Sequence, residues 1–342
     1  MSGKLKWGII AAGRIARTFA QALAESTTGE LVAIGSRSRE TAERFGDEFG
    51  VKHRHPTYAS LLDNSEVEAV YIAPLHPMHA EWAIKAAEAG KHILCEKPLT
   101  MNYKEAAAVV DAARTHDVFL MEAFMYRCHP QTRKIVELIR EGAIGDVRVI
   151  QAAFSFHAEE IADSRILEHH LGGGGILDVG CYCASITRLI AGVAVGQDFA
   201  EPVEFSAYGH IGETSRVDEY TVATAKFPGD IVAQLSTGIL VEQESVVRVY
   251  GTEGYLYIPE PWVPGSKGES TYVHLHKKGE DKGEKITIEA DRGLFTIEAD
   301  LVAEHIGNRQ APPPAMTWDD TLGNMRMLDL WRGAIGLVYD FE

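Results

Sequence analysis

Short apolar runs alternate with amphipathic stretches through the first 120 residues, and this alternation restricts the fold more than any other feature of the chain. The apolar runs LKWGIIAA, ELVAIGS, VEAVYIA, KHILCE and VFLME are nearly continuous, which is typical of strands buried on both faces of a parallel sheet. The stretches between them, such as RIARTFAQALAES and HAEWAIKAAEAG, have helical spacing. Asn102 and Glu105 have the spacing of a capping box at the start of one such helix. This order of elements predicts a doubly wound α/β domain.

After about residue 150 the pattern changes to consecutive strands. The segments DEYTVATAKF, DIVAQLSTGIL, SVVRVYG and YLYIPE are joined by turn signals, which predicts an antiparallel sheet. Two helical stretches follow, FTIEADLVAEHIG and DDTLGNMRMLDLWRGAIG, and the charged segment KKGEDKGEK is predicted to be a solvated hairpin tip. We therefore predict one domain over residues 1–123 and a second over residues 124–342, whose C-terminal helices can pack back on the first domain.

The composition excludes several classes of partner. A net charge of −16 opposes binding to nucleic acid and to anionic membranes, and no apolar run approaches the ~20 residues that span a bilayer. The first residues, MSGKLKWGII, enter a strand pattern with no signal segment ahead of it, so we expect a cytoplasmic protein. The four cysteines are scattered without zinc-type pairs, which predicts buried reduced thiols.

The segment GIIAAGRIA, residues 8–16, is an altered dinucleotide fingerprint between a strand and a helix. Ala11 stands where the first glycine is usual, and alanine is tolerated there only if its φ stays negative. Gly13 lets the backbone approach a pyrophosphate, and Ala16 lets the helix pack closely on the sheet. The helix N-terminus then offers unpaired N–H groups to the phosphates.

The segment AIGSRSRE favours NADP over NAD, although NAD remains possible. NAD-binding chains carry an acidic residue about twenty residues past the glycine turn, whereas this chain has Ser36 and Arg37 there. A guanidinium at that place can pair with a 2′-phosphate and stack on adenine. The alternative is an exposed basic helix start.

Two further segments carry residues able to do chemistry. Lys97 follows the apolar run HILCE, at a strand end where ligands of open α/β sheets bind; the alternative is a salt bridge to Glu96. Asp178 and Tyr182 follow the run Gly172 to Gly175 and share a helical face. Four glycines indicate a mobile loop or a close approach to a ligand. Removing hydride from an alcohol also requires removing its proton, and an ammonium lowers the pKa of a tyrosine from its usual ~10.

The ordered set GIIAAGRIA, SRS, APLHPMHAEWAIKAAEAGKHILCEKPLT and GGILDVGCYC resembles the glucose–fructose oxidoreductase/inositol dehydrogenase (Gfo/Idh/MocA) family. It is most similar to the branch that holds dimeric dihydrodiol dehydrogenase and NADP-dependent aldose (xylose) dehydrogenases. The resemblance implies an α/β fold with an N-terminal Rossmann domain and a C-terminal α/β domain built on a large, mainly antiparallel open sheet, which commonly mediates dimerisation. It also implies that the peptide before Pro98 is often cis.

The resemblance assigns roles to these residues. It implies that Lys97 contacts the reacting hydroxyl, that Tyr182 transfers the proton and that Asp178 binds substrate. Further candidates for substrate contact are His79, Arg127 (otherwise a surface ion pair) and His169. Trp262 is either an aromatic wall for a sugar ring or a core anchor. We predict cofactor contacts from Ala12, Gly13, Arg14, Ile15, Ser36, Arg37, Pro74, Leu75, His79, Glu96 and Lys97. His76 and His79 lack an accompanying carboxylate cluster, so no metal site is expected.

We therefore expect an NADP(H)-dependent oxidoreductase that acts on a cyclic sugar or polyol, in first place an aldopyranose oxidised at C1 to the lactone. The alternatives are a keto-sugar reductase or trans-dihydrodiol dehydrogenase with the same residues, a cofactor-dependent glycosidase, and a non-catalytic NADP/sugar sensor. A homodimer or higher homo-oligomer is implied by the resemblance.

Overall fold

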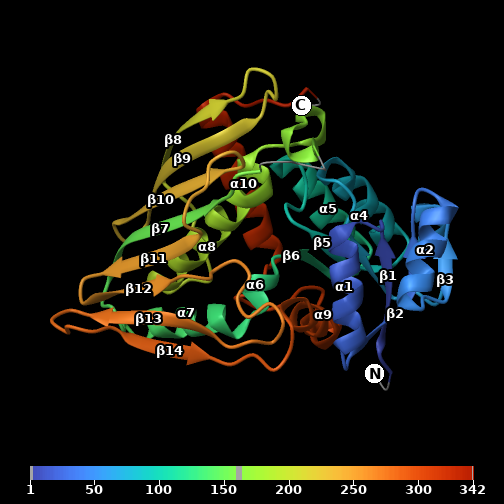
Figure 1. Cartoon of the computed structure of the whole chain (residues 1–342), viewed down its shortest axis with the longest axis horizontal. Helices are drawn as coiled ribbons and strands as arrows, with labels where there is room; N and C mark the ends of the chain where they lie inside the picture. The colour runs from blue at the N-terminus through green and yellow to red at the C-terminus, as the bar shows by residue number, and fades with distance from the viewer. Residues whose placement is uncertain (1–2, 159–163, 341) are drawn as a thin grey trace. The chain divides into compact units, whose positions relative to one another are not determined.

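The computed structural model describes residues 3–158, 164–340 and 342. Its internal contacts divide the chain into two compact units. The first unit contains Met1–Cys128, Ser266–Gly268 and Asp291–Thr321. The second contains His129–Gly265, Glu269–Ala290 and Leu322–Glu342. Figure 1 follows the chain through both units by colour.

The first unit is built on a six-stranded parallel sheet with the strand order β3-β2-β1-β4-β5-β6. This is the order of a Rossmann dinucleotide-binding domain, so the predicted doubly wound fold is confirmed. The strands are β1 (Leu5–Ile10), β2 (Gly29–Gly35), β3 (His53–His55), β4 (Ala69–Ile72), β5 (His92–Glu96) and β6 (Leu120–Ala123). The helices are α1 (Arg14–Glu25), α2 (Arg39–Phe49), α3 (Tyr58–Leu62), η1 (His76–Met78), α4 (His79–Glu88), α5 (Tyr103–Thr115), α6 (Met125–Cys128), α9 (Leu294–His305) and η5 (Ile306–Asn308).

Local sequence explains where these helices begin. The Ser38 side chain accepts the Thr41 N–H at the start of α2. At the start of α5 the Asn102 side chain accepts the Glu105 N–H at 3.0 Å, and Glu105 Oε2 accepts the Met101 N–H at 3.2 Å. The helix start predicted from Asn102 and Glu105 is therefore confirmed.

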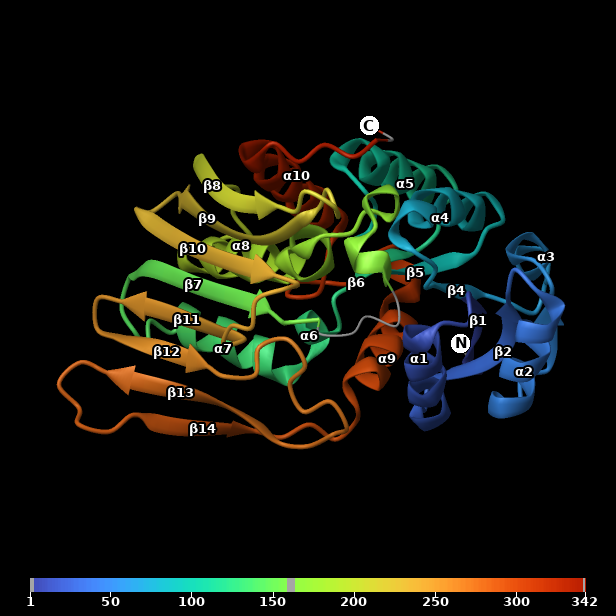
Figure 2. The ribbon, with the colours of Figure 1, turned by 45° about the horizontal axis from the view of Figure 1, so that its top comes forward.

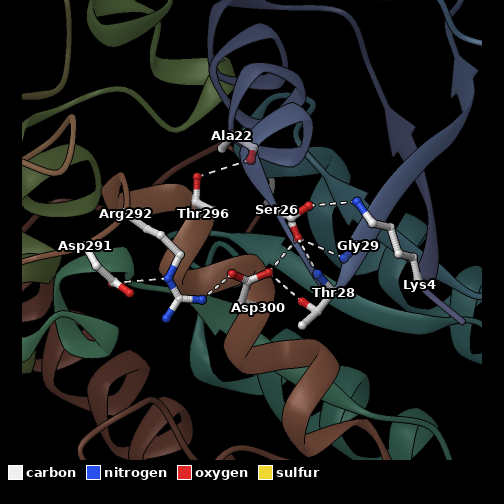
Figure 3. Close-up of polar contacts among 9 residues, drawn as sticks. All are labelled: Lys4, Ala22, Ser26, Thr28, Gly29, Asp291, Arg292, Thr296 and Asp300. Carbon is white, nitrogen blue, oxygen red and sulfur yellow. Dashed lines mark hydrogen bonds and ion pairs between the residues drawn. The ribbon is translucent and has the colours of Figure 1, made fainter. Parts of the chain in front are cut away.

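Helix α9 comes from the C-terminal third of the sequence but belongs to the first unit, where it packs against α1. Figure 3 shows the polar contacts at this junction. The buried Asp300 carboxylate accepts hydrogen bonds from the Ser26 and Thr28 hydroxyls, each at 2.5 Å, and pairs with Arg292. A buried carboxylate is tolerated only when it is bonded in this way, so these contacts fix α9 against the β2 end of α1.

The second unit is built on an eight-stranded sheet with the order β14-β13-β12-β11-β7-β10-β9-β8. All neighbouring strands are antiparallel except β7 and β10, which confirms the predicted mainly antiparallel sheet. The strands are β7 (Val147–Ser155), β8 (Glu204–Ile211), β9 (Asp218–Phe227), β10 (Ile231–Gly238), β11 (Val246–Gly251), β12 (Gly254–Ile258), β13 (Thr271–Lys277) and β14 (Glu284–Ile288). The helices are α7 (Pro130–Arg140), η2 (Ser164–Leu167), η3 (His169–Leu171), η4 (Ile176–Gly180) and α8 (Cys181–Ala194), and α10 (Trp318–Ile335) begins in the first unit and ends in the second.

One face of this sheet is covered and the other is open. Helices α7 and α8 lie on the covered face (Figure 2), where α8 packs against β7 and β10. On the open face, large apolar side chains reach solvent: Tyr208 is 83% exposed, Val222 47% and Val232 48%. Tyr208 of β8 lies directly opposite Val222 of β9. The open sheet implied by the family resemblance is therefore present.

One helical stretch of the described chain, His169–Ala194, is long and apolar enough by composition to cross a bilayer. Its apolar window is wholly buried inside the protein. Buried core helices of folded proteins pass the same test, so this stretch is the helical core beneath the sheet.

Candidate active site

The turn between β1 and α1 differs from the expectation at its first position. Ala11 has a φ of +81°, in the left-handed region, while its N–H donates to the Gly35 carbonyl at 3.0 Å. The prediction that alanine requires a negative φ here is wrong. The turn keeps the conformation that glycine usually supplies, at a cost of roughly 1–2 kcal/mol for a residue with a Cβ.

Gly13 is the N-cap of α1 and has an ordinary φ of −73°. A Cβ built at this position would contact nothing within 4 Å, so the protein's own packing does not require glycine. No side chain caps α1 and no acidic residue occupies its first turn. The helix N-terminus is thus free to bind an anion. Ala12, Arg14 and Ile15 flank this position and are at least partly accessible.

The two arginines of the segment after β2, Arg37 and Arg39, have different neighbours. Ser36 is buried, and its N–H donates to the His55 carbonyl. Arg39 lies 4.0 Å from Glu43 along α2. Arg37 is exposed, and its guanidinium lies close enough to Tyr58 to lower the pKa of that hydroxyl, although burial raises this pKa more strongly. Arg37 is therefore an exposed cation of this segment that could meet a 2′-phosphate.

The ends of β4 and β5 carry the remaining predicted cofactor contacts of the first unit. Pro74 and Leu75 follow β4 and are partly accessible. Glu96 is the last residue of β5, and its carboxylate accepts a hydrogen bond from the Tyr71 hydroxyl. Lys97 follows and is partly accessible. The Lys97–Pro98 peptide bond is cis, as the resemblance implied.

His79 does not present its ring to a ligand. It is 0% exposed, its Nδ1 lies 2.9 Å from the Pro98 carbonyl, and its Nε2 lies 3.1 Å from the Pro74 carbonyl. Burial lowers the pKa of His79, whereas the two carbonyls raise it. Both ring nitrogens face main-chain oxygens, so the predicted contacts with substrate and cofactor are corrected to a contact with the backbone.

Arg127 is likewise buried and hydrogen-bonded inside the first unit. It is 1% exposed, its Nη2 bonds Asp320 Oδ2 at 2.6 Å, and its Nε donates to the Pro314 carbonyl at 2.5 Å. Neither the predicted substrate contact nor the alternative of a surface ion pair describes this residue. Because a buried cation requires such partners, Arg127 has a structural role.

In the second unit, a π-helical turn carries the predicted substrate aspartate. Asp178 lies within η4, which passes directly into α8 at Cys181 and Tyr182. Arg165 Nη2 lies 3.8 Å from Asp178 Oδ1. π-Helical turns occur frequently at functional sites, and this one brings Asp178 and Tyr182 into the same helical segment.

Tyr182 packs within a cluster of three aromatic rings. Its ring meets Phe154 edge-on at 5.3 Å and Trp262 at 5.8 Å, and the Phe154 and Trp262 rings stack at 5.4 Å. Trp262 is 3% exposed, and its Nε1 donates to the Ala153 carbonyl. Of the two alternatives for Trp262, the structure shows the core anchor, and this anchor supports the tyrosine ring directly.

Side chains and main-chain groups of the protein itself lie against the run Gly172 to Gly175. A Cβ on Gly174, whose φ is +112°, would lie 2.1 Å from Asp218 Oδ1, and one on Gly173 would lie 2.5 Å from the Ile166 carbonyl. The Tyr339 hydroxyl donates to the Gly173 carbonyl at 2.6 Å. The predicted close approach is therefore an internal packing contact.

Asp218 holds the start of the π-helical turn. It is 0% exposed, and its Oδ2 accepts the Ile176 N–H at 2.7 Å. Burial raises the pKa of Asp218 to about 7. The sequence analysis missed Asp218 because its partner is remote in the chain. The available signal was an acidic residue at the start of an alternating strand.

His169 faces the C-terminal segment of the chain. Its Nε2 lies 3.0 Å from the Val338 carbonyl and its Nδ1 lies 3.3 Å from Asp340 Oδ2. The ring also packs against Tyr339. The predicted substrate contact is therefore corrected to a packing role.

All four cysteines are buried and free of disulfides, as predicted. Within residues 3–158, 164–340 and 342, no group of three or more His, Cys, Asp or Glu side chains could hold a metal ion.

Comparison with known proteins assigns both halves of the chain. A family model described as the GFO/IDH/MocA oxidoreductase family, NAD-binding Rossmann fold, matches residues 5–124. The model of the GFO/IDH/MocA C-terminal domain matches residues 132–257.

Relatives are similar over most of the chain. A trans-1,2-dihydrobenzene-1,2-diol dehydrogenase from Xenopus tropicalis is 34% identical over 264 residues, which covers 76% of this chain and 77% of the relative. A Homo sapiens protein of the same name is 30% identical over 344 residues and 98% of each chain. Among solved structures, KijD10, a 3-ketoreductase from Actinomadura kijaniata in complex with NADP and TDP-benzene, superposes with a TM-score of 0.86. It is 28% identical, and the match covers 97% of this chain and 98% of that one.

The open space at Gly13 leads to a first prediction. We expect Gly13→Val to fold with an unfolding midpoint near that of the wild type, because a Cβ at this position meets nothing within 4 Å. Its dissociation constant for NADPH, measured by fluorescence titration, should rise at least about tenfold, which corresponds to ~1.4 kcal/mol.

The matched control for Gly13 is Gly307→Val, since Gly307 also has open space around its Cβ position. The control should bind NADPH as the wild type does. Wild-type affinity in Gly13→Val would contradict the phosphate cradle.

The buried Asp218 carboxyl leads to a second prediction. Its folded-state pKa of about 7 lies above the ordinary value of 3.8, so the native state binds more protons between these values. Its stabilising contribution is full below the ordinary pKa and is lost as the pH rises through about 7. Asp218→Asn keeps an acceptor for the Ile176 N–H and cannot ionise. We therefore expect the variant to gain stability relative to the wild type by up to ~1.4 kcal/mol per pH unit between about pH 5 and 7.

Urea unfolding of both proteins across this pH range measures the difference for Asp218. The exposed Asp281, replaced by Asn, provides a control that should show no such trend. A stability difference between Asp218→Asn and the wild type that does not change with pH would show that Asp218 is already ionised at the lowest pH.

Proposed function

This chain belongs to the GFO/IDH/MocA family of oxidoreductases, and we propose that it transfers hydride between NADP(H) and a cyclic sugar or polyol, by oxidising an aldopyranose at C1 to the lactone. The observation that carries the proposal is the presence in one chain of a lysine directly after β5 and a tyrosine following Asp178 on a buried helical segment. A tyrosine can accept a hydroxyl proton, and an ammonium lowers the pKa of that tyrosine, so these two groups together can carry out this step.

The chain is an NAD(P)-dependent oxidoreductase, and the first unit fits this cofactor. The uncapped N-terminus of α1 beside Gly13 suits the pyrophosphate, and Arg37 suits a 2′-phosphate. When bound, the nicotinamide supplies the site that accepts or gives hydride. We propose that Pro74, Leu75 and Glu96, at the ends of β4 and β5, border it.

Tyr182 acts as the proton-transfer residue in this proposal. Its ring is held by Phe154 and Trp262 and is 4% exposed. An apolar surrounding disfavours a phenolate unless a cation is nearby. Lys97, which directly follows β5, contributes its ammonium to the reaction in this proposal, as the family resemblance implies. Asp178 accepts a hydrogen bond from a second substrate hydroxyl.

The reverse reaction uses the same groups, with Tyr182 returning its proton to a carbonyl oxygen. The solved structure named a 3-ketoreductase supports this second candidate. The relatives named trans-1,2-dihydrobenzene-1,2-diol dehydrogenase support a third, oxidation of a dihydrodiol by the same groups. A glycosidase would retain its dinucleotide and release free sugar from a glycoside. A sensor would bind ligands without turnover.

A substrate panel separates these functions. NADP⁺ reduction is followed by absorbance with aldoses, inositols and trans-dihydrodiols, and NADPH oxidation with keto-sugars. We expect turnover with an aldopyranose. Turnover of only dihydrodiols or only keto-sugars would replace the aldopyranose as the proposed substrate. Binding of a sugar without turnover of any compound in the panel would contradict an oxidoreductase that acts on sugars.

The roles of Lys97 and Tyr182 lead to a third prediction. Lys97→Met and Tyr182→Phe should each lower kcat about 10²- to 10⁴-fold, as expected for loss of acid–base catalysis. NADPH affinity should change little in both. The matched control for Lys97 is Lys104→Met, which alters an exposed side chain. Near-normal turnover in either active-site variant would remove that residue from the mechanism.

We further propose that the open sheet face meets a second copy of this chain. Exposed Tyr208 and Val222 lie opposite each other on it, and exposed Val232 lies further along the same face. Exposed apolar side chains gathered on one face mark protein interfaces. Sedimentation velocity at micromolar concentration should give a dimer or larger assembly, which Val222→Lys weakens. A monomeric wild type would contradict this proposal.

A further inference from the structure

Two buried side chains hold the peptide group one residue beyond Lys97. The Pro98 carbonyl oxygen lies 2.9 Å from His79 Nδ1, and the Leu99 N–H donates to Glu122 Oε1 at 2.8 Å. The carbonyl of residue 98 and the N–H of residue 99 belong to the same planar peptide group. We propose that His79 and Glu122 are positioning residues that clamp this peptide and thereby fix the direction of the Lys97 side chain. The consequence for catalysis rests on the proposed function of Lys97.

The His79 ring ties together the ends of two strands. His79 is the first residue of α4, and its second nitrogen, Nε2, lies 3.1 Å from the Pro74 carbonyl, which follows β4. A neutral imidazole has one N–H, so the ring donates to one of these two carbonyls, and the proposed clamp uses the tautomer with the proton on Nδ1, facing Pro98. The ring therefore spans from the segment after β4 to the segment after β5, where the reactive lysine begins.

Glu122 grips the other side of the same peptide from β6. It is 1% exposed. Burial raises the pKa of Glu122 to about 7, opposed by the Leu99 N–H, the nearby Thr321 side chain and the Arg127 guanidinium. Both protonation states are therefore populated near neutral pH. Each retains an oxygen that can accept the Leu99 N–H, so the clamp depends on the position of the carboxyl group and not on its charge.

The clamped peptide is coupled to Lys97 through a short and stiff piece of chain. The proline ring fixes φ of Pro98, and peptide bonds do not rotate freely. Few soft dihedrals therefore separate the held peptide plane from the Lys97 Cα. The Lys97 ammonium also lowers the pKa of His79, which places its charge near the clamp. Movement of the Pro98–Leu99 peptide must therefore redirect this ammonium.

If Glu122 had a purely structural role, its loss would have a different effect. Buried main-chain groups need hydrogen-bond partners whatever their function. Loss of Glu122 would then lower the stability of the protein and leave the acid dissociation constant of Lys97 unchanged. The Lys97 ammonium must therefore be observed directly. Reductive ¹³C-methylation followed by NMR resolves individual lysines, and the signal of Lys97 is the one that Lys97→Arg removes.

We expect Glu122→Ala to change the acid dissociation constant of Lys97 at least about threefold, or roughly half a pH unit. Glu122→Gln retains an acceptor for the Leu99 N–H and should keep the wild-type value. His79→Asn tests the other side of the peptide, because the shorter amide cannot reach both the Pro74 and the Pro98 carbonyl. This variant should also change the acid dissociation constant of Lys97. The control is Glu105→Ala, which removes a carboxylate that accepts a main-chain N–H at Met101, two residues further along.

An unchanged Lys97 titration in Glu122→Ala and His79→Asn would overturn the clamp. Should neither variant fold, hydrogen exchange of the wild type decides, because a clamped Leu99 amide must exchange slowly and a freely exchanging one contradicts the proposal. With a substrate in hand, Glu122→Ala should lower kcat while the dissociation constant for NADPH stays near wild type. If no substrate is turned over by the wild type, the proposed function fails, whereas the NMR and exchange measurements still test the clamp.

Discussion

The parallel arrangement of the first sheet constrains everything that follows in this protein. All six strands end at one edge, so the segments after β1, β2, β4 and β5 are brought together although they are distant in sequence. The strand order reverses between β1 and β4, and ligands of open α/β sheets bind at such a point. Gly13, Arg37 and Lys97 each follow one of these strands. The candidate chemistry of the first unit therefore follows from its topology.

Single buried carboxylates support the functional segments in both units. Glu122 accepts one main-chain N–H beside Lys97, and Asp218 accepts another at the start of the helix that carries Tyr182. Burial raises the pKa of each to about 7. Such groups cost stability when they ionise, and both retain an acceptor oxygen when neutral. The protein uses them where the backbone must be held precisely.

The fold was predictable from the sequence because its signals are local. Apolar runs and caps gave the strands and helices of the first unit, although the short polar strand β3 carries no such signal. Motif spacing and the family resemblance predict roles for Lys97, Asp178 and Tyr182, and these roles stay predictions. The environments of His79, Arg127 and His169 were not predictable, since each is decided by a partner remote in sequence or by a main-chain carbonyl. Asp218 was missed for the same reason. Ala11 shows that an unfavourable φ can be retained where the turn requires it.

The account's central claim is that hydride passes directly between the sugar and the cofactor. Mass spectrometry of the NADPH formed from an aldopyranose deuterated at C1 tests this most directly. The account predicts that the wild-type protein transfers deuterium from C1 as deuteride and produces NADPH labelled on its nicotinamide ring, with no deuterium released to water. Unlabelled NADPH, or deuterium recovered in the solvent, would contradict it.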